Sequence, residues 1–442
     1  MIVTWWVLFS TPGRAEPGWR EASPSPVTEI ELQWMARELA PAVEEAAGRP
    51  FVELPEIVLA GPEQIAEVVY QEQRALLEQR GEVVAEADTR ENAAAVSALF
   101  AGKYGFVDRK LYVSVEGIAD SIALEGQPEW LLRPVIRVVV AHELAHALQD
   151  QHLDLQRRVA DAPNGDAIMA LNCAVEGHAV WVHEQVGKRE GLDEAVRLMA
   201  DLLGSDDALR RRMDPDAFYH TYVYGLGRDF VAYHAKRGGT ERVWEVLAAP
   251  PDATRAIVSP EAWGADPSAP LDPRARRVIR RAGLRLAGKD WQPEDSVVGD
   301  FDVRDQLVRA GADDGLADAL DSGWNTRLVG GAMAGVEVQV LRFTTGDAAV
   351  AFVDGMLGQA RTQAALVGAD PFIQADAGEF DRVESDRSAR EAFTMSMFGP
   401  SEQLGRVWVA RGTDVVQVVL VNAPASDREL AATIDQVFRS LR

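Results

Sequence analysis

Two histidines and a glutamate lie close together in an apolar stretch of the sequence. His142, Glu143 and His146 form an HExxH pattern within Val138–Leu148. Residues four apart in a helix lie one turn apart on the same face, so both imidazoles can bind one tetrahedral metal ion. Glu143 projects beside that ion, where its carboxylate can take a proton from metal-bound water and return it to a leaving amine. Burial of these three side chains without a partner would be unfavourable, which favours a metal site.

A site of this kind needs a third protein ligand. The candidates are Glu176, His152, His178 and Asp150. Glu176 is preferred because it is an isolated acid on an apolar helix face, and the neighbouring Gly177 lets helices approach closely. His152 is disfavoured because Gln149 lets the first helix continue, which places His152 about 15 Å along the axis from His142.

A hydrolytic site also needs a hydrogen-bond donor for the oxyanion of its tetrahedral intermediate. His220, Tyr222 and Tyr224 form a polar-aromatic cluster after the predicted ligand helices. We predict that Tyr222 is this donor. Tyrosines at alternate positions are also typical of half-buried packing residues, so the role is a hypothesis.

The elements that must position these residues are mainly helices. The segment 130–151 is too long and too apolar for a strand and is predicted to be a buried helix. A second helix is predicted over 164–186, with Asn164 or Asp166 as its N-cap. Upstream, 50–54 and 56–59 are predicted to form a strand pair. We therefore expect residues 27–300 to form a mainly helical, zincin-like metallopeptidase domain with a small N-terminal sheet.

The pattern changes after about residue 322. Strands are expected over 336–343, 391–397, 406–410 and 415–421, with helices near 347–365 and 426–441. The basic stretch 274–289 is interpreted as a solvated helix face. Residues 322–442 are thus predicted to form a separate α+β, sandwich-like C-terminal domain, and the whole chain an α+β multidomain protein.

Composition limits the classes of partner. The 442 residues carry a formal net charge of -24, which would repel a phosphate backbone and disfavours nucleic acid as a partner. The single cysteine, Cys173, allows neither an internal disulfide nor a zinc site with several thiolates. Cys173 lies in an apolar run and is interpreted as a buried packing residue.

The first 26 residues are predicted to be a leader and a flexible tether. Met1–Phe9 is apolar but short and has no basic start, so it is a weak export signal. The pattern favours export to the periplasm, cell envelope or medium, with a cytoplasmic location as the alternative. No other segment is long and apolar enough to span a membrane.

Four segments of the sequence resemble those of a known family. They are Val139–His152, which contains the HExxH pattern, Val175–Ala179, Tyr222–Val231 and Pro250–Glu261. Together they resemble a family of largely uncharacterised bacterial gluzincin-type zinc metallopeptidases. The resemblance implies zinc ligands at His142, His146 and Glu176 and a catalytic base at Glu143. The chain departs from the family pattern at His178, where an acid is expected, and at Ser259, where a histidine is expected.

The sequence therefore predicts a Zn²⁺-dependent metallopeptidase that hydrolyses peptide or protein substrates through a zinc-bound water activated by Glu143. Two alternatives remain open. One is a non-catalytic binding protein that zinc only stabilises, which would favour four protein ligands. The other is a zinc hydrolase that acts on amides or esters other than peptides.

Overall fold

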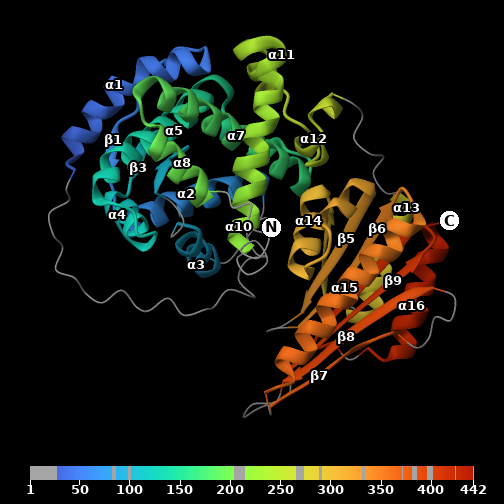
Figure 1. Cartoon of the computed structure of the whole chain (residues 1–442). Helices are drawn as coiled ribbons and strands as arrows, with labels where there is room; N and C mark the ends of the chain where they lie inside the picture. Colours follow the sequence, from blue (N-terminus) through green and yellow to red (C-terminus); the bar gives the residue numbers. More distant parts are fainter. Residues whose placement is uncertain are drawn as a thin grey trace. The chain divides into compact units, whose positions relative to one another are not determined.

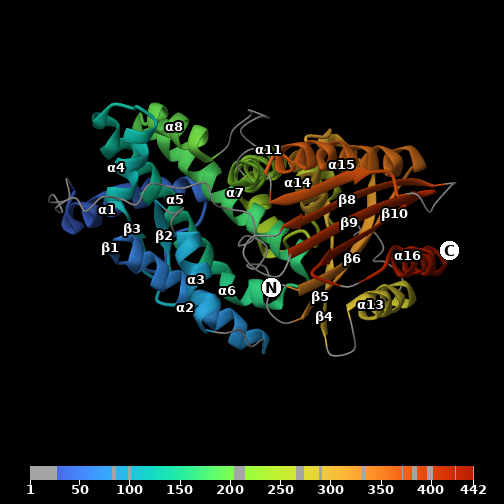
Figure 2. The same ribbon diagram turned by 90° about the horizontal axis from the view of Figure 1, so that it is seen from below.

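The computed structural model describes residues 27–81, 86–97, 101–203, 215–264, 273–287, 291–330, 334–370, 372–380, 386–395, 402–423 and 425–441 (Figures 1 and 2). The chain divides into two compact units. The helical unit comprises 1–163, 170–204 and 220–251, and the sheet unit comprises 164–169, 205–219 and 252–442. The predicted leader and tether, 1–26, lie outside the described residues.

The helical unit contains a three-stranded sheet packed among helices. Its strands are β1 (Ile57–Leu59), β2 (Gly102–Tyr104) and β3 (Leu111–Val113), in the order β1-β3-β2. Its helical segments are α1 (Glu29–Ala47), α2 (Pro62–Arg80), α3 (Glu86–Ser97), α4 (Val115–Leu124), η1 (Glu129–Leu131), α5 (Leu132–Leu153), α6 (Leu155–Asp161), α7 (Gly165–Glu190), α8 (Asp193–Leu203), the π-helix η2 (Thr221–Leu226) and α11 (Gly227–Ala248). Helix α7 belongs to this unit from Ala170 onward. The short α10 (Pro215–His220) precedes η2.

The predicted strand pair near residue 55 is wrong in its pairing. Only 57–59 forms a strand, and it pairs in parallel with β3. The backbone N–H groups of Val52 and Glu53 instead donate to the side-chain oxygen of Gln151, and the Gln151 amide donates to the Glu53 carbonyl. A side chain from α5 thus satisfies the groups that a strand partner would have bonded.

Helix α5 is the central helix of this unit. It packs against α1, α8, β2 and β3, and every residue from Val138 to Asp150 is buried. A helix with no solvated face must be surrounded by protein, which explains why its sequence lacks a polar stripe. The predicted buried helix is confirmed over Leu132–Leu153.

Helices α7 and α11 meet backbone to backbone. A Cβ added to Gly177 would lie 2.1 Å from the carbonyl carbon of Gly227, and one added to Gly227 would lie 2.2 Å from the carbonyl oxygen of Cys173. Gly177 does permit close helix packing, but the helix that approaches it there is α11. This contact fixes the start of α11, and hence η2 before it, next to the segment that carries Glu176.

The sheet unit is built on seven strands. They are β4 (Gln292–Val297), β5 (Leu320–Gly330), β6 (Ala334–Phe343), β7 (Ile373–Gly378), β8 (Arg387–Met395), β9 (Glu402–Arg411) and β10 (Asp414–Val421). The order is β4-β5-β6-β10-β9-β8-β7, and all neighbours are antiparallel. The remaining segments are α12 (Arg255–Val258), η3 (Pro260–Ala262), α13 (Pro273–Ala287), α14 (Asp300–Ala310), η4 (Asp314–Ala319), α15 (Gly346–Val367) and α16 (Asp427–Leu441).

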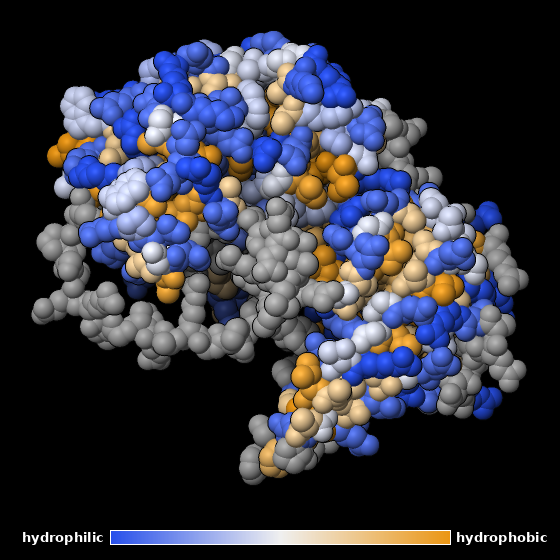
Figure 3. All heavy atoms as spheres, in the orientation of Figure 1, coloured by the Kyte–Doolittle hydropathy of each residue, from blue (hydrophilic) through white to orange (hydrophobic). Residues whose placement is uncertain are grey.

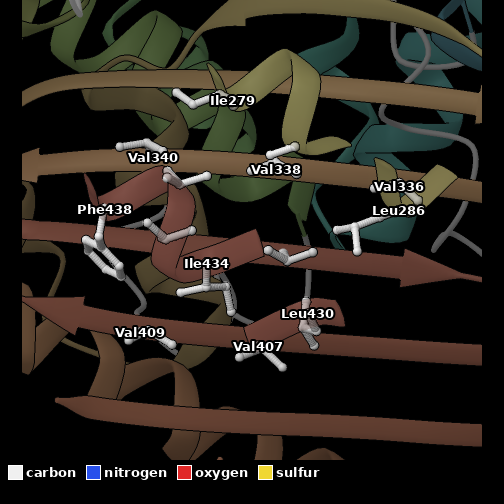
Figure 4. Close-up of a cluster of buried hydrophobic side chains, with 14 of the residues drawn as sticks. Ile279, Leu286, Val336, Val338, Val340, Val407, Val409, Leu430, Ile434 and Phe438 are labelled. Atoms are coloured by element: carbon white, nitrogen blue, oxygen red, sulfur yellow. The ribbon is translucent and has the colours of Figure 1, made fainter. Parts of the chain in front are cut away.

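Helices cover both faces of this sheet. Figure 2 shows α15 on one face and α13 and α16 on the other. In Figure 4, Val336, Val338 and Val340 of β6 and Val407 and Val409 of β9 gather with apolar side chains from α16 and α13. A second apolar cluster packs α14, α15 and η4 against the opposite face. The C-terminal part is therefore an α+β unit with one antiparallel sheet, as predicted in outline.

The sheet unit begins earlier than the predicted boundary between residues 300 and 322. Both α13 and β4 belong to it. Ile279, Ala282 and Leu286 of α13 are buried in the apolar cluster on the sheet. The basic stretch is therefore an amphipathic helix whose apolar stripe anchors it, and only its other face is solvated.

Hydrophilic side chains dominate the face of the molecule shown in Figure 3, and hydrophobic ones form small patches between them. Among the described residues, no helix is both long enough and apolar enough to cross a membrane.

We predict that Gly177→Ala destabilises the protein by about 1–3 kcal/mol, because its methyl group must displace the backbone of α11. Gly225→Ala is the matched control, since its added Cβ meets no heavy atom closer than 4.0 Å. Urea unfolding of the two variants and the wild type provides the measurement. Equal unfolding midpoints for Gly177→Ala and Gly225→Ala would contradict this account of the α7–α11 contact.

Candidate metal centre

Three side-chain atoms from α5 and α7 converge in the helical unit. His142 and His146 lie one turn apart on α5, and their Nε2 atoms are 3.1 Å from each other. Oε2 of Glu176 on α7 is 3.2 Å from each of these nitrogens. Ligand atoms at 2.0–2.1 Å from a tetrahedral zinc ion are about 3.3 Å apart, so the observed triangle matches one face of that coordination shell.

This triangle can hold a metal ion. It consists of two imidazole nitrogens and one carboxylate oxygen, a donor set that suits zinc. Both histidines are buried and Glu176 is half-buried. Among the described residues, these three are the only group of histidine, cysteine or acidic side chains that meets the distance requirement for metal binding. No fourth protein ligand joins them there.

Gln149 fixes the orientation of the His146 ring. Its side-chain nitrogen donates to the backbone carbonyl of Val175, 2.8 Å away, which requires the amide oxygen to face His146. That oxygen lies 2.9 Å from Nδ1 of His146 and can only accept a hydrogen bond. In its neutral form His146 therefore carries its hydrogen on Nδ1, which leaves the lone pair of Nε2 for the triangle.

The same amide also engages His178. Nε2 of Gln149 lies 2.9 Å from Nδ1 of His178, which accepts its second hydrogen. His178 is fully buried against Trp181 and Trp244. His178 thus supports the metal ligands through Gln149 and does not itself join the triangle.

His183 plays the corresponding part for His142. The Nδ1 atoms of these two rings are 3.1 Å apart, so one of them must donate to the other. With Nε2 of His142 turned to the triangle, its Nδ1 carries the hydrogen and His183 accepts it. Each ligand histidine is therefore oriented by a buried partner, as metal-binding histidines usually are.

The charges of the three triangle residues and their neighbours favour a bound cation. Burial lowers the pKa of His146, but the negative charge of Glu176 outweighs burial and raises this pKa to about 9. Burial works against ionisation of Glu176, yet the two imidazoles hold its pKa below the usual value. Burial lowers the pKa of His178 to about 3 and that of His183 well below its ordinary value. Glu176 thus keeps its charge, while both supporting rings stay neutral.

Glu143 follows the candidate ligand His142 on α5, and its side chain reaches β2 of the small sheet. Its Oε2 accepts a hydrogen bond of 2.7 Å from the backbone N–H of Tyr104 in β2. A Cβ at Gly102 would come within 3.0 Å of the Glu143 side chain and 2.7 Å of Val139, so β2 can lie this close to α5 only because residue 102 is glycine. β2 is one of the two edge strands of the three-stranded sheet.

Of the predicted polar-aromatic cluster of His220, Tyr222 and Tyr224, the residue whose ring lies near His142 is Tyr224. The ring centroid of Tyr224 lies 6.1 Å from that of His142 and 5.7 Å from that of His220. Tyr224 is partly exposed, whereas Tyr222, the predicted oxyanion donor, is only 1% exposed. Tyr224 is therefore better placed than Tyr222 to meet a bound molecule.

The other ligand candidates lie elsewhere. His152 is exposed near the end of α5, where its Nε2 is 3.0 Å from the carbonyl of Pro50. Asp150 accepts from the Tyr104 hydroxyl and from the backbone N–H of Leu155. The helix continues through Gln149, as expected, and this carries both residues away from the triangle.

The spacing of Gln149 and His183 from the candidate ligands is a signal in the sequence for their supporting role. Gln149 follows His142 by seven residues and His183 follows Glu176 by seven, which is two helical turns in each case. Both therefore lie on the same helix face as a ligand. A polar residue at that spacing on an otherwise apolar face is a candidate partner for the ligand.

The chain matches no protein-family model and no curated protein. A solved structure of a hydrolase candidate with a novel fold from Chloroflexus aurantiacus is similar over 55% of this chain and 91% of that chain, with 16% sequence identity and a TM-score of 0.38.

We predict that Gln149→Leu weakens zinc binding by about 10–100-fold, because His146 loses the acceptor that fixes its ring. Competition with a chromophoric chelator measures the affinity. Gln151→Leu is the matched control, since Gln151 lies on the same helix but bonds only the backbone of residues 52 and 53. Equal zinc affinities for the two variants would show that Gln149 does not orient the ligand.

Proposed function

We propose that this protein is a zinc-dependent metallopeptidase of the gluzincin type. The observation that carries the proposal is the triangle of His142, His146 and Glu176, whose interatomic distances of 3.1–3.2 Å suit one face of a zinc shell. The three-ligand count within the described residues supports a catalytic site, because structural zinc sites are usually closed by a fourth protein ligand.

When bound, zinc would make water a stronger nucleophile at neutral pH and polarise the substrate carbonyl. The protein's own part in the chemistry falls to Glu143. It follows the first ligand on α5 and is buried, so its carboxylate can hold a proton out of contact with bulk water. We assign Glu143 as the general base, which then returns the proton to the leaving amine.

The position of β2 supports a peptide as substrate. An extended peptide can add to an edge strand through main-chain hydrogen bonds, and β2 is the edge strand whose Tyr104 N–H bonds Glu143. The Tyr104 N–H now donates to Glu143. In this proposal the substrate carbonyl takes over that N–H and leaves the Glu143 carboxylate free to accept a proton.

Tyr224 completes the proposed site. Its ring is near His142 and partly exposed, so its hydroxyl is the candidate donor to the oxyanion that forms on the substrate carbonyl. His220, whose ring is 5.7 Å away, contacts the same side chain and can hold it in place.

We predict that Glu143→Gln keeps one zinc per chain but lowers the rate of casein or peptide-library hydrolysis by about 10²–10⁴-fold, the usual contribution of a general base. Metal content is measured on the same preparations. Glu129→Gln, an exposed change shortly before α5, is the control and should behave as wild type. Unchanged hydrolysis by Glu143→Gln would rule out the proposed mechanism. Binding of zinc without hydrolysis by the wild type would favour a structural zinc site.

We further predict that Tyr224→Phe lowers kcat by about 10–10³-fold with little change in KM, because an oxyanion donor acts mainly in the transition state. Tyr222→Phe is the matched control from the same π-helix and should leave kcat near its wild-type value. A larger loss in Tyr222→Phe than in Tyr224→Phe would restore Tyr222 as the donor.

A further inference from the structure

Four large apolar side chains of the helical unit are exposed near the place where α1 and α5 begin. Ile30 and Trp34 of α1 are 71% and 59% exposed. Trp130 of η1 is 59% exposed, and Leu124 at the end of α4 is 82% exposed. Single exposed apolar residues are common on proteins, but a contiguous group of them marks an interaction surface.

An ion pair joins the first turns of α1 and α5. Nη2 of Arg133 in α5 donates to Oε1 of Glu31 in α1 at 2.9 Å, and both side chains are exposed. Ile30 and Trp34 are four residues apart on α1 and therefore share a face beside Glu31. Trp130 precedes Arg133 by three residues, which is less than one helical turn. Ile30, Trp34 and Trp130 thus lie around one exposed ion pair.

The loop between α4 and η1 extends this group. Every residue from 123 to 130 is exposed, and Leu124 and Trp130 lie near the two ends of that stretch. Helix α4 packs against η1, and it lies near the start of α1 in both views (Figures 1 and 2). We call Ile30, Trp34, Leu124 and Trp130 together the apolar corner.

The fold does not require apolar residues at the exposed positions of α1. Helix α1 buries Leu32, Met35 and Leu39, and this stripe already anchors the helix in the unit. At 100° per residue, Ile30 and Trp34 lie on the opposite side of the helix from that stripe. An isoleucine and a tryptophan on the solvated face of an amphipathic helix are typical of a surface that meets a partner.

The residue types in and beside the apolar corner suit a bilayer interface. Tryptophan is enriched at such interfaces because its ring is apolar and its N–H can bond a headgroup. The guanidinium of Arg37 lies 5.6 Å from the ring centroid of Trp34. An arginine can lay its aliphatic stem along apolar surface and extend its charged end to a lipid phosphate.

The sequence before α1 favours a lipid surface over a protein partner. Met1–Phe9 contains no charged side chain and includes Trp5 and Trp6. The 17 residues 10–26 separate it from Val27, and a chain of that length spans at most about 60 Å. Two apolar parts of one chain are thus held near each other. A single weak apolar signal gives only reversible membrane binding, whereas two together give stable attachment.

The charges around the apolar corner determine which lipids fit. Glu29, Glu125 and Glu129 are exposed near it, and the whole chain carries a formal net charge of -24. Carboxylates repel anionic headgroups and attract the ammonium groups of zwitterionic ones. The surface that matches is therefore a bilayer of zwitterionic phospholipid.

We propose that the apolar corner binds the surface of a zwitterionic phospholipid bilayer. The rings of Trp34 and Trp130 lie at the level of the headgroups, and Ile30 and Leu124 contact the acyl chains. Arg37 donates to lipid phosphates. This surface belongs to the helical unit and is independent of the proposed metal chemistry.

Co-sedimentation of the full-length protein with lipid vesicles tests the proposal. We expect the wild type to bind vesicles of phosphatidylcholine. Binding should weaken as phosphatidylglycerol replaces this lipid, because phosphatidylglycerol adds negative charge to the surface. No binding to phosphatidylcholine, or binding that strengthens with phosphatidylglycerol, would overturn the proposal.

A double variant locates the surface. Trp34→Ala combined with Trp130→Ala should lower the partition coefficient for phosphatidylcholine vesicles by at least about tenfold, because two aromatic rings no longer enter the interface. Phe372→Ala is the matched control, since Phe372 is an exposed aromatic residue of the sheet unit, and it should bind as the wild type does. Unchanged binding by the double variant, or an equal loss in Phe372→Ala, would contradict the assignment of the apolar corner.

Sedimentation velocity without lipid separates a lipid surface from a second copy of the chain. We expect the wild type and the double variant to sediment alike at every concentration. A concentration-dependent dimer that the double variant abolishes would show that the apolar corner is a protein interface and would overturn the proposal. If the double variant does not fold, the lipid series on the wild type still decides the question.

Discussion

The metal centre depends on how α7 is held against α5. The hydrogen bond from Gln149 to the carbonyl of Val175 joins the two helices directly beside Glu176. The same amide accepts from His146 and donates to His178. One buried side chain therefore sets the distance between the helices and the orientation of a ligand ring at once. Gly177 of α7 also lies so close to Gly227 of α11 that neither residue could carry a Cβ without a shift of the backbone.

This arrangement is costly to bury without a cation. Two ligand histidines, a glutamate and two supporting histidines lie in a region that excludes most water. The raised pKa of His146 shows that Glu176 attracts a positive charge strongly enough to overcome burial. A divalent ion would satisfy that attraction by displacing the proton of His146 and taking one lone pair from each of the three side chains.

The parts of the fold that the sequence could predict are those set by local periodicity. The length and apolar character of residues 130–151 identified α5, and an isolated acid on an apolar face identified Glu176. The strands β6, β8, β9 and β10 were predicted because their residues are apolar at regular intervals. Strands β4, β5 and β7 were missed. The edge strands β4 and β7 have a single neighbour, and polar residues such as those of 292–297 carry no apolar alternation. The interior strand β5 mixes polar residues such as Asn325 and Arg327 with its apolar ones.

Contacts between distant segments were harder to predict. Gln149 has three partners, and two of them lie on another helix. The choice between Tyr222 and Tyr224 depends on the π-helical geometry of 221–226, which shifts the face that each side chain occupies. None of these features follows from spacing within one segment.

X-ray absorption at the zinc edge of the purified protein tests whether His142, His146 and Glu176 hold zinc in an open site. We expect a four-coordinate ion with nitrogen and oxygen neighbours at about 2.0–2.1 Å, including two imidazoles and an exchangeable water, and no sulfur. Protein without zinc, or a zinc ion with four protein ligands, would contradict it.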